Sequence, residues 1–168
     1  MNNSYSFRYR NFIIAIIFSA FTGCATCPKN PSQVIRGGKY DGCNLSNMDL
    51  SGQDYSNTSF RNAYINHSDL SNANFEKADL RGITIKQSNL IDSNLRDAQL
   101  GGAKLLFNNM QGTDLKDATG SKVEFTGSSL DNAIWVSGRV CTTNSTGYCN
   151  KQKTYKKIDK MENVSNER

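Results

Sequence analysis

The five cysteines are the most chemically versatile residues of this chain, because thiols can form disulfides, bind metals or carry a covalent modification. Cys24 follows an apolar segment, and the other four form an even set. Cys141 and Cys149 bracket a short loop containing Gly, Ser and Thr, and we predict that a disulfide closes it in an oxidising compartment. Cys27 and Cys43 could pair in the same way. A buried free thiol at Cys43 is the alternative.

Other residue types that support catalysis form no recognisable constellation. His67 is the only histidine, and no second histidine or partnered nucleophile accompanies it. Acidic residues are plentiful, but most fall at positions of a repeat that point outward and solvate the surface. The sequence also contains no glycine-rich loop for phosphate. We therefore predict no enzymatic activity, no metal site and no cofactor.

A period of five residues runs through the chain from 40 to 135. A helix would space apolar residues three or four apart and a strand two apart, so a period of five fits neither. Columns read twenty residues apart stay apolar, which is the pattern of a coil with four sides of five residues each. Gly120 is the one gap in the series, and we predict a local bulge or looser packing there rather than a ligand pocket. The inward series begins at Tyr40 and continues with Leu45, Leu50, Tyr55, Phe60, Ile65, Leu70, Phe75, Leu80, Ile85, Leu90, Leu95, Leu100, Leu105, Met110, Leu115, Phe125, Leu130 and Trp135.

These repeats resemble the pentapeptide-repeat family, whose pattern is a small residue, Asp or Asn, Leu or Phe, and two variable positions. Ala78-Asp79-Leu80 and Ser88-Asn89-Leu90 match it closely, and the resemblance covers 96 of the 168 residues. It implies an all-β fold, the right-handed quadrilateral β-helix. About five coils spaced roughly 4.8 Å apart would make a rod on the order of 24 Å long. The four cysteines would then lie in pairs at opposite ends, which disfavours a shared zinc site.

Both ends of such a coil need a cover. Asn30 as N-cap, Pro31 as first residue and Gly37 as terminator predict a short N-terminal helical cap, with Val34 and Ile35 closing the stack. At the other end, Trp135, Val136 and Val140 would supply apolar cover. We predict a signal peptide over 1–23, an anchor linker and cap over 24–39, the β-helix over 40–136, a C-terminal cap with a disulfide loop over 137–149, and a basic, disordered tail over 150–168.

The N-terminal segment has the pattern of a secretory signal. An apolar run of about 13 residues over 11–23 follows two arginines, and it is shorter than the roughly 20 residues of a membrane-spanning helix. Its end, Phe21 to Cys24, resembles the bacterial lipoprotein signal, which implies cleavage before Cys24 and a lipid on that residue. Phe21 departs from the usual leucine. Cleavage near Ala25 and an uncleaved anchor are the alternatives. We expect a lipoprotein anchored to a membrane of the bacterial cell envelope, at the outer membrane or periplasmic face if the cell is Gram-negative.

Apolar residues also occur at outward positions of the repeat. Leu106 and Phe107 follow the inward Leu105, and Tyr64 lies at an outward position on the same side of the coil. Clustered exposed apolar residues mark interaction sites, so these three form a candidate patch. A small insertion that covers the coil, or a homodimer contact, would give the same pattern.

Charge argues against nucleic acid as a partner. The segment 40–135 holds 8 basic and 12 acidic residues, a net of −4, whereas 136–168 holds 7 basic and 3 acidic, a net of +4. The basic tail is typical of a solvated extension, or of one that adheres to anionic lipid. We predict a structural or protein-interaction scaffold, with an unknown protein partner and a membrane contact through the lipid anchor. Relatives suggest one alternative, a DNA-mimic modulator of type II topoisomerase, which would require a cytoplasmic location. An envelope enzyme or metal binder is a third hypothesis, without a visible site.

Overall fold

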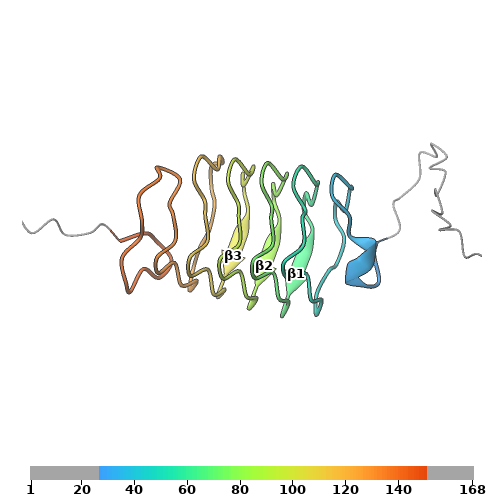
Figure 1. Ribbon diagram of the computed structural model, residues 1–168, viewed down its shortest axis with the longest axis horizontal. Helices are drawn as coiled ribbons and strands as arrows, with labels where there is room; N and C mark the ends of the chain where they lie inside the picture. Colours follow the sequence, from blue (N-terminus) through green and yellow to red (C-terminus); the bar gives the residue numbers. More distant parts are fainter. Residues whose placement is uncertain (1–26, 151–168) are drawn as a thin grey trace, which may run out of the picture.

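A computed structural model describes residues 27–150, which wind into a stack of similar coils along one axis (Figure 1). The candidate signal 1–23, the lipid-attachment residue Cys24 and the tail beyond Asn150 lie outside the described residues. Neighbouring coils are twenty residues apart, since Asp49 pairs in parallel with Asp69 and Asn74 with Asn94. The four-sided coil predicted from the repeat is therefore the fold of the chain.

One side of the coil carries regular strands. β1 (Tyr64–Asn66), β2 (Thr84–Lys86) and β3 (Lys104–Leu106) form a parallel sheet in the order β1-β2-β3. Their register places Ile65 beside Ile85, and Ile85 beside Leu105. The strands are only three residues long, because the chain turns a corner every five residues.

Corners fall at the second position after each inward residue, and the backbone there is left-handed. Asn47 has a φ of 60° and Asp92 one of 53°, and the same conformation recurs at every fifth residue from 37 to 132. Asn, Asp and Gly tolerate this region better than other residues do, which explains why they fill most corners. Phe107, with a φ of 56°, is the only apolar residue among the positive-φ residues of the described part.

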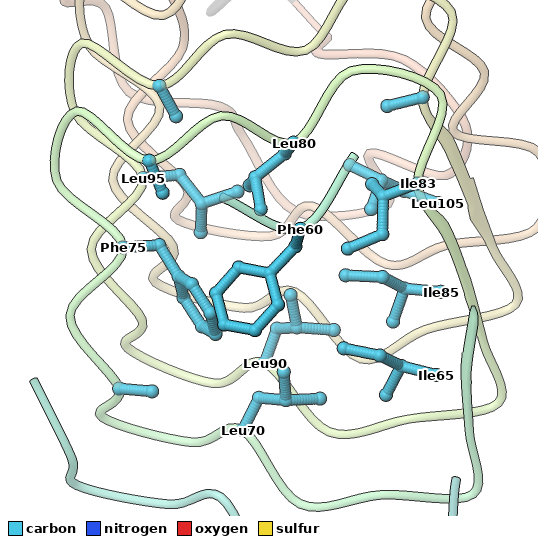
Figure 2. Close-up of a cluster of buried hydrophobic side chains, with 14 of the residues drawn as sticks. Phe60, Ile65, Leu70, Phe75, Leu80, Ile83, Ile85, Leu90, Leu95 and Leu105 are labelled. Atoms are coloured by element: carbon cyan, nitrogen blue, oxygen red, sulfur yellow. The ribbon is translucent and has the colours of Figure 1, made fainter. Parts of the chain in front are cut away.

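Inward side chains fill the centre of the coil (Figure 2). Leu45, Ile65, Leu70 and Leu115 have no exposed surface, and small residues such as Ala73 are buried beside them. Burying a large aliphatic side chain contributes about 1.5–3 kcal/mol, so the column supplies the main driving force for stacking. Aromatic rings gather at the N-terminal end, where those of Tyr40 and Phe60 stack with centroids 5.5 Å apart.

Polar residues inside the coil form a ladder along its axis. The backbone N–H of Ser68 donates to Ser88 Oγ at 3.1 Å, that of Ser88 to Asn108 Oδ1 at 2.9 Å, and that of Asn108 to Ser128 Oγ at 2.9 Å. All four residues are buried. Because each group has a partner, the ladder avoids the cost of buried polar atoms and ties consecutive coils together.

The two ends differ from the sequence prediction in detail. The 3-10 helix η1 (Pro31–Gln33) begins at the predicted proline, but it ends four residues before Gly37. Val34 is buried as expected, whereas Ile35 is 58% exposed and does not close the stack. The Tyr40 hydroxyl fastens this end instead, accepting from the Ile35 N–H at 2.8 Å and donating to the Gln33 carbonyl at 2.9 Å.

Candidate interaction surfaces

The potential metal ligands of the described residues do not gather at one site. No group of three or more His, Cys, Asp or Glu side chains within 27–150 is arranged to hold an ion. His67 lies at an exposed corner with a φ of 52°. Among the same residues, no helix has the length and apolar character that crossing a bilayer requires. The features that remain are surfaces and the two ends of the coil.

Strand register separates the members of the candidate patch. Tyr64 on β1 aligns with Thr84 and then Lys104, two coils further on, whereas Leu106 on β3 aligns with Lys86. Polar side chains of β2 therefore lie between Tyr64 and the other two residues. Tyr64 is 38% exposed and Leu106 is half-buried.

Phe107 is the prominent member of that patch. Its side chain is 61% exposed, and its ring lies so close to Gly127 that a Cβ on that glycine would overlap it. A bulky residue in left-handed backbone costs on the order of 1 kcal/mol. Strain that is retained without burial suggests a role other than stability.

Sulfur atoms are paired at both ends of the coil. Cys27 Sγ lies 2.08 Å from Cys43 Sγ, and Cys141 Sγ lies 2.10 Å from Cys149 Sγ. The sequence left two alternatives for Cys43, a disulfide with Cys27 or a buried free thiol. Cys43 is indeed buried, with 2% of its surface exposed, but its sulfur is paired with that of Cys27. The first pair joins the segment before η1 to the first coil, and the second closes the loop after the last coil.

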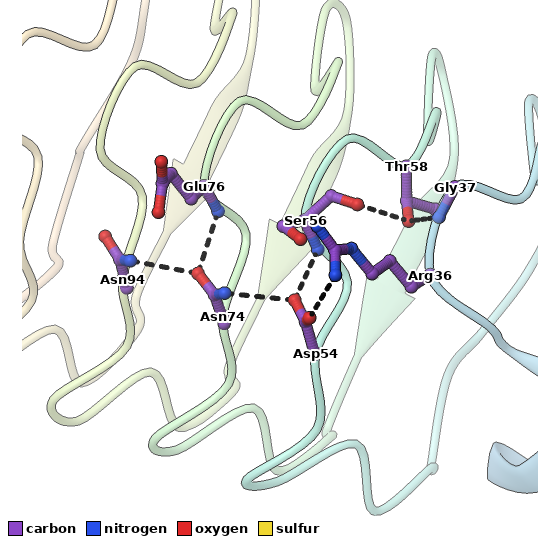
Figure 3. A network of polar contacts seen from close by, with 8 residues as sticks. All are labelled: Arg36, Gly37, Asp54, Ser56, Thr58, Asn74, Glu76 and Asn94. Carbon is purple, nitrogen blue, oxygen red and sulfur yellow. Dashed lines mark hydrogen bonds and ion pairs between the residues drawn. The ribbon is translucent and has the colours of Figure 1, made fainter.

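A ladder of Asx side chains runs along another side of the coil (Figure 3). Asn74 Nδ2 donates to Asp54 Oδ1 at 3.0 Å, and Asn94 Nδ2 donates to Asn74 Oδ1 at 2.9 Å. Hydrogen bonds from Ser56 lower the pKa of Asp54, and the one from its backbone N–H has the largest effect. Arg36 also reaches this carboxylate, at 3.5 Å. The polar groups of this ladder are therefore hydrogen-bonded within the coil, and we infer that the ladder stabilises the fold.

An apolar cleft of about 400 Å³ opens at the C-terminal end of the stack. Its lining includes Leu100, Gly120, Phe125, Trp135 and Tyr148. The sequence predicted a local bulge or looser packing at Gly120 and no ligand pocket. A cleft opens beside the glycine, while the glycine backbone itself lies directly against the coil below. The glycine in the inward column, where every other repeat has a large side chain, was the sequence feature that could have indicated the cleft.

Comparisons with known proteins agree with this architecture. Residues 36–107 match the family described as pentapeptide repeat region. A pentapeptide repeat protein (Rfr23) from the cyanobacterium Cyanothece 51142 is 28% identical, with a TM-score of 0.50 over 58% of this chain and 63% of its own length. The chain thus spans less than two thirds of that relative. A pentapeptide repeat protein from the Arabidopsis thaliana thylakoid lumen is 21% identical, with a TM-score of 0.60 over 73% of this chain and 90% of its own.

Two further results bear on function. QnrB1, a plasmid-mediated fluoroquinolone resistance protein, is 15% identical with a TM-score of 0.40, which is too low to carry an argument about activity. A search of curated proteins found no match. The matched residues, the twenty-residue coil and the left-handed corners together show that residues 36–107 form a pentapeptide repeat region and that the chain adopts the right-handed β-helix of pentapeptide repeat proteins.

Proposed function

We propose that this chain is an exported, lipid-anchored scaffold that binds a protein partner in the bacterial envelope. The pairing of cysteines at both ends of the coil carries the proposal. Disulfides persist in oxidising compartments and are rare in reducing ones. Two staples in so short a chain therefore support export, in agreement with the secretory pattern before Cys24.

Cys24 would fix the orientation of the scaffold. It precedes Cys27 by three residues, and three extended residues span at most about 11 Å. Because Cys27 is bonded to Cys43 of the first coil, a lipid on Cys24 would hold the N-terminal end of the rod next to the membrane. The C-terminal end would then face away from it.

The exposed sides of the coil supply the interaction surface. They carry polar and charged side chains, and Phe107 projects from them at a corner. An exposed aromatic ring on a rigid support is the kind of anchor that protein partners use. The function therefore needs no catalytic group.

Mass spectrometry of the mature protein, with and without reduction, tests the proposal directly. We expect an N-terminus at Cys24 that carries a lipid. Reduction of two disulfides should add the mass of four hydrogen atoms, because each S–S bond takes up two electrons and two protons to give two thiols. Cys24→Ala should abolish lipidation and membrane association but leave both disulfides in place. An unprocessed chain with free thiols in the cytosolic fraction would contradict the proposal.

A further inference from the structure

The C-terminal segment covers only part of the last coil. Leu130 N–H donates to the Ser145 carbonyl at 2.7 Å, and Trp135 N–H donates to the Arg139 carbonyl at 2.8 Å. The returning chain lies antiparallel to the coil here, since Ser129 pairs with Thr146 and Ile134 with Val140. This pairing ends at Ser128, whose carbonyl accepts from Gly147.

The edge along residues 118–125 is left open. One coil below, Leu100 N–H donates to the Thr119 carbonyl at 2.6 Å, and Leu105 N–H donates to the Glu124 carbonyl at 2.7 Å. The equivalent N–H groups of Gly120 and Phe125 have no partner among residues 27–150. An unpaired edge of this kind is a template for an added extended segment.

The apolar cleft lies beside this open edge. Phe125 and Trp135 line it with ring centroids 5.3 Å apart, and both are only half-buried. Their counterparts one coil below, Leu105 and Leu115, are fully buried. The end of the stack thus combines unmade backbone hydrogen bonds with apolar surface that a further coil would have covered.

We propose that the chain's own segment 151–168 binds this edge and places an apolar side chain in the cleft. The described chain ends at Asn150, two residues beyond Tyr148, which itself lines the cleft. Eighteen residues follow, and about eight extended residues match the edge from 118 to 125.

Composition of the segment matches the surface around the edge. Residues 151–160 contain five lysines and one aspartate. The exposed Asp117 precedes the edge, and the exposed Glu124 lies on it together with one lysine, Lys122. Tyr155 and Ile158 are the first large apolar residues after Asn150, so either can enter the cleft. The bound segment completes the cover of the last coil, which a solenoid requires.

Trp135, the only tryptophan of the chain, reports on the cleft directly. We expect the double variant Tyr155→Ser, Ile158→Ser to shift its fluorescence to longer wavelength. Amide hydrogen exchange at Gly120 and Phe125 should become about tenfold faster, because their hydrogen bonds are lost. Both substitutions lie outside residues 27–150, so they remove none of the contacts described within the coil.

Tyr155→Phe serves as the matched control, and it should leave the emission and the exchange unchanged. Identical spectra and exchange for the parent and the double variant would overturn the proposal. A Trp135 emission that changes with protein concentration would also overturn it, since a second copy would then be the occupant.

Discussion

Gly120→Ala should destabilise the chain more than the same change at any corner glycine. Gly120 has a φ of +151°, and a Cβ built on it would lie 2.5 Å from the Gly101 nitrogen and 2.7 Å from the Leu100 carbonyl carbon. Both are backbone atoms of the coil below. Because they are backbone atoms, they cannot rotate aside as the end of a flexible side chain could.

Gly102→Ala is the matched control. Gly102 has a φ of +71°, and a Cβ there would meet no atom within 4 Å. Its substitution therefore costs only the left-handed strain of about 1 kcal/mol. Gly120→Ala adds overpacking of about 1–3 kcal/mol to backbone strain of similar size, which gives roughly 3 kcal/mol or more.

Thermal and urea denaturation followed by circular dichroism would measure both variants. For a chain of this length 1 kcal/mol corresponds to roughly 3 °C, so we expect a loss of about 10 °C for Gly120→Ala and about 3 °C for the control. Equal losses in the two variants would refute the reasoning, because the contact with the coil below would then carry no weight.

Three further changes test other parts of the structure. Tyr55→Phe removes a buried hydroxyl that has no partner among the described residues, and it should raise the free energy of unfolding, measured in urea, by about 1 kcal/mol. Burial raises the pKa of Tyr55 to about 12, so an absorbance titration should show its ionisation only near that pH or on unfolding. Replacing Cys141 and Cys149 together by Ser opens a loop of sequence separation 8 and should cost about 2.5 kcal/mol, which reduction of the parent should reproduce at that end. The paired Arg81 guanidinium lowers the pKa of Asp79 below its ordinary 3.8, so this carboxylate stabilises the fold above that pH and loses its contribution as the pH falls through the lowered value. Arg81→Gln should therefore make the urea midpoint depend less on pH below about pH 4. The same pH dependence in the variant and the parent would contradict the assignment.

The inward column and the corners could be predicted from the sequence because both are local. Every fifth residue points inward, and the residue two places later must adopt a positive φ. Leu70 and Leu90 are buried for that reason, and Asn72 and Asp92 occupy corners. Neither property depends on what lies elsewhere in the chain.

The ends could not be predicted in this way, because residues 27–150 supply no further coil to bury them. Phe125 and Trp135 have the correct spacing, yet they remain half-buried since nothing stacks fully above them. Ile35 fails for a related reason, as the helix that should have positioned it stops at Gln33.

The candidate patch depends on position along the axis as well as on the side of the coil. The twenty-residue period alone aligns Tyr64 with position 104, and Leu106 with Lys86, so the separation of the patch was available from the sequence. Grouping residues by side of the coil ignored their position along its axis. Phe107 survives as a candidate because its evidence, exposure at a strained corner, is independent of Tyr64.

The terminal coils are stabilised differently from the interior coils. Interior coils have a neighbour on each side, so their backbone groups and apolar residues are satisfied by repetition, and sequence changes at exposed positions leave the stack intact. A terminal coil has one neighbour, and it is held by features that occur once: Cys27–Cys43 and the Tyr40 hydroxyl at one end, Cys141–Cys149 at the other. Once segment 151–168 is displaced, fraying should therefore begin along 118–125, where the N–H groups of Gly120 and Phe125 have no partner among residues 27–150. Any ligand of that edge stabilises the whole stack, because it binds the ordered coil and not the frayed one.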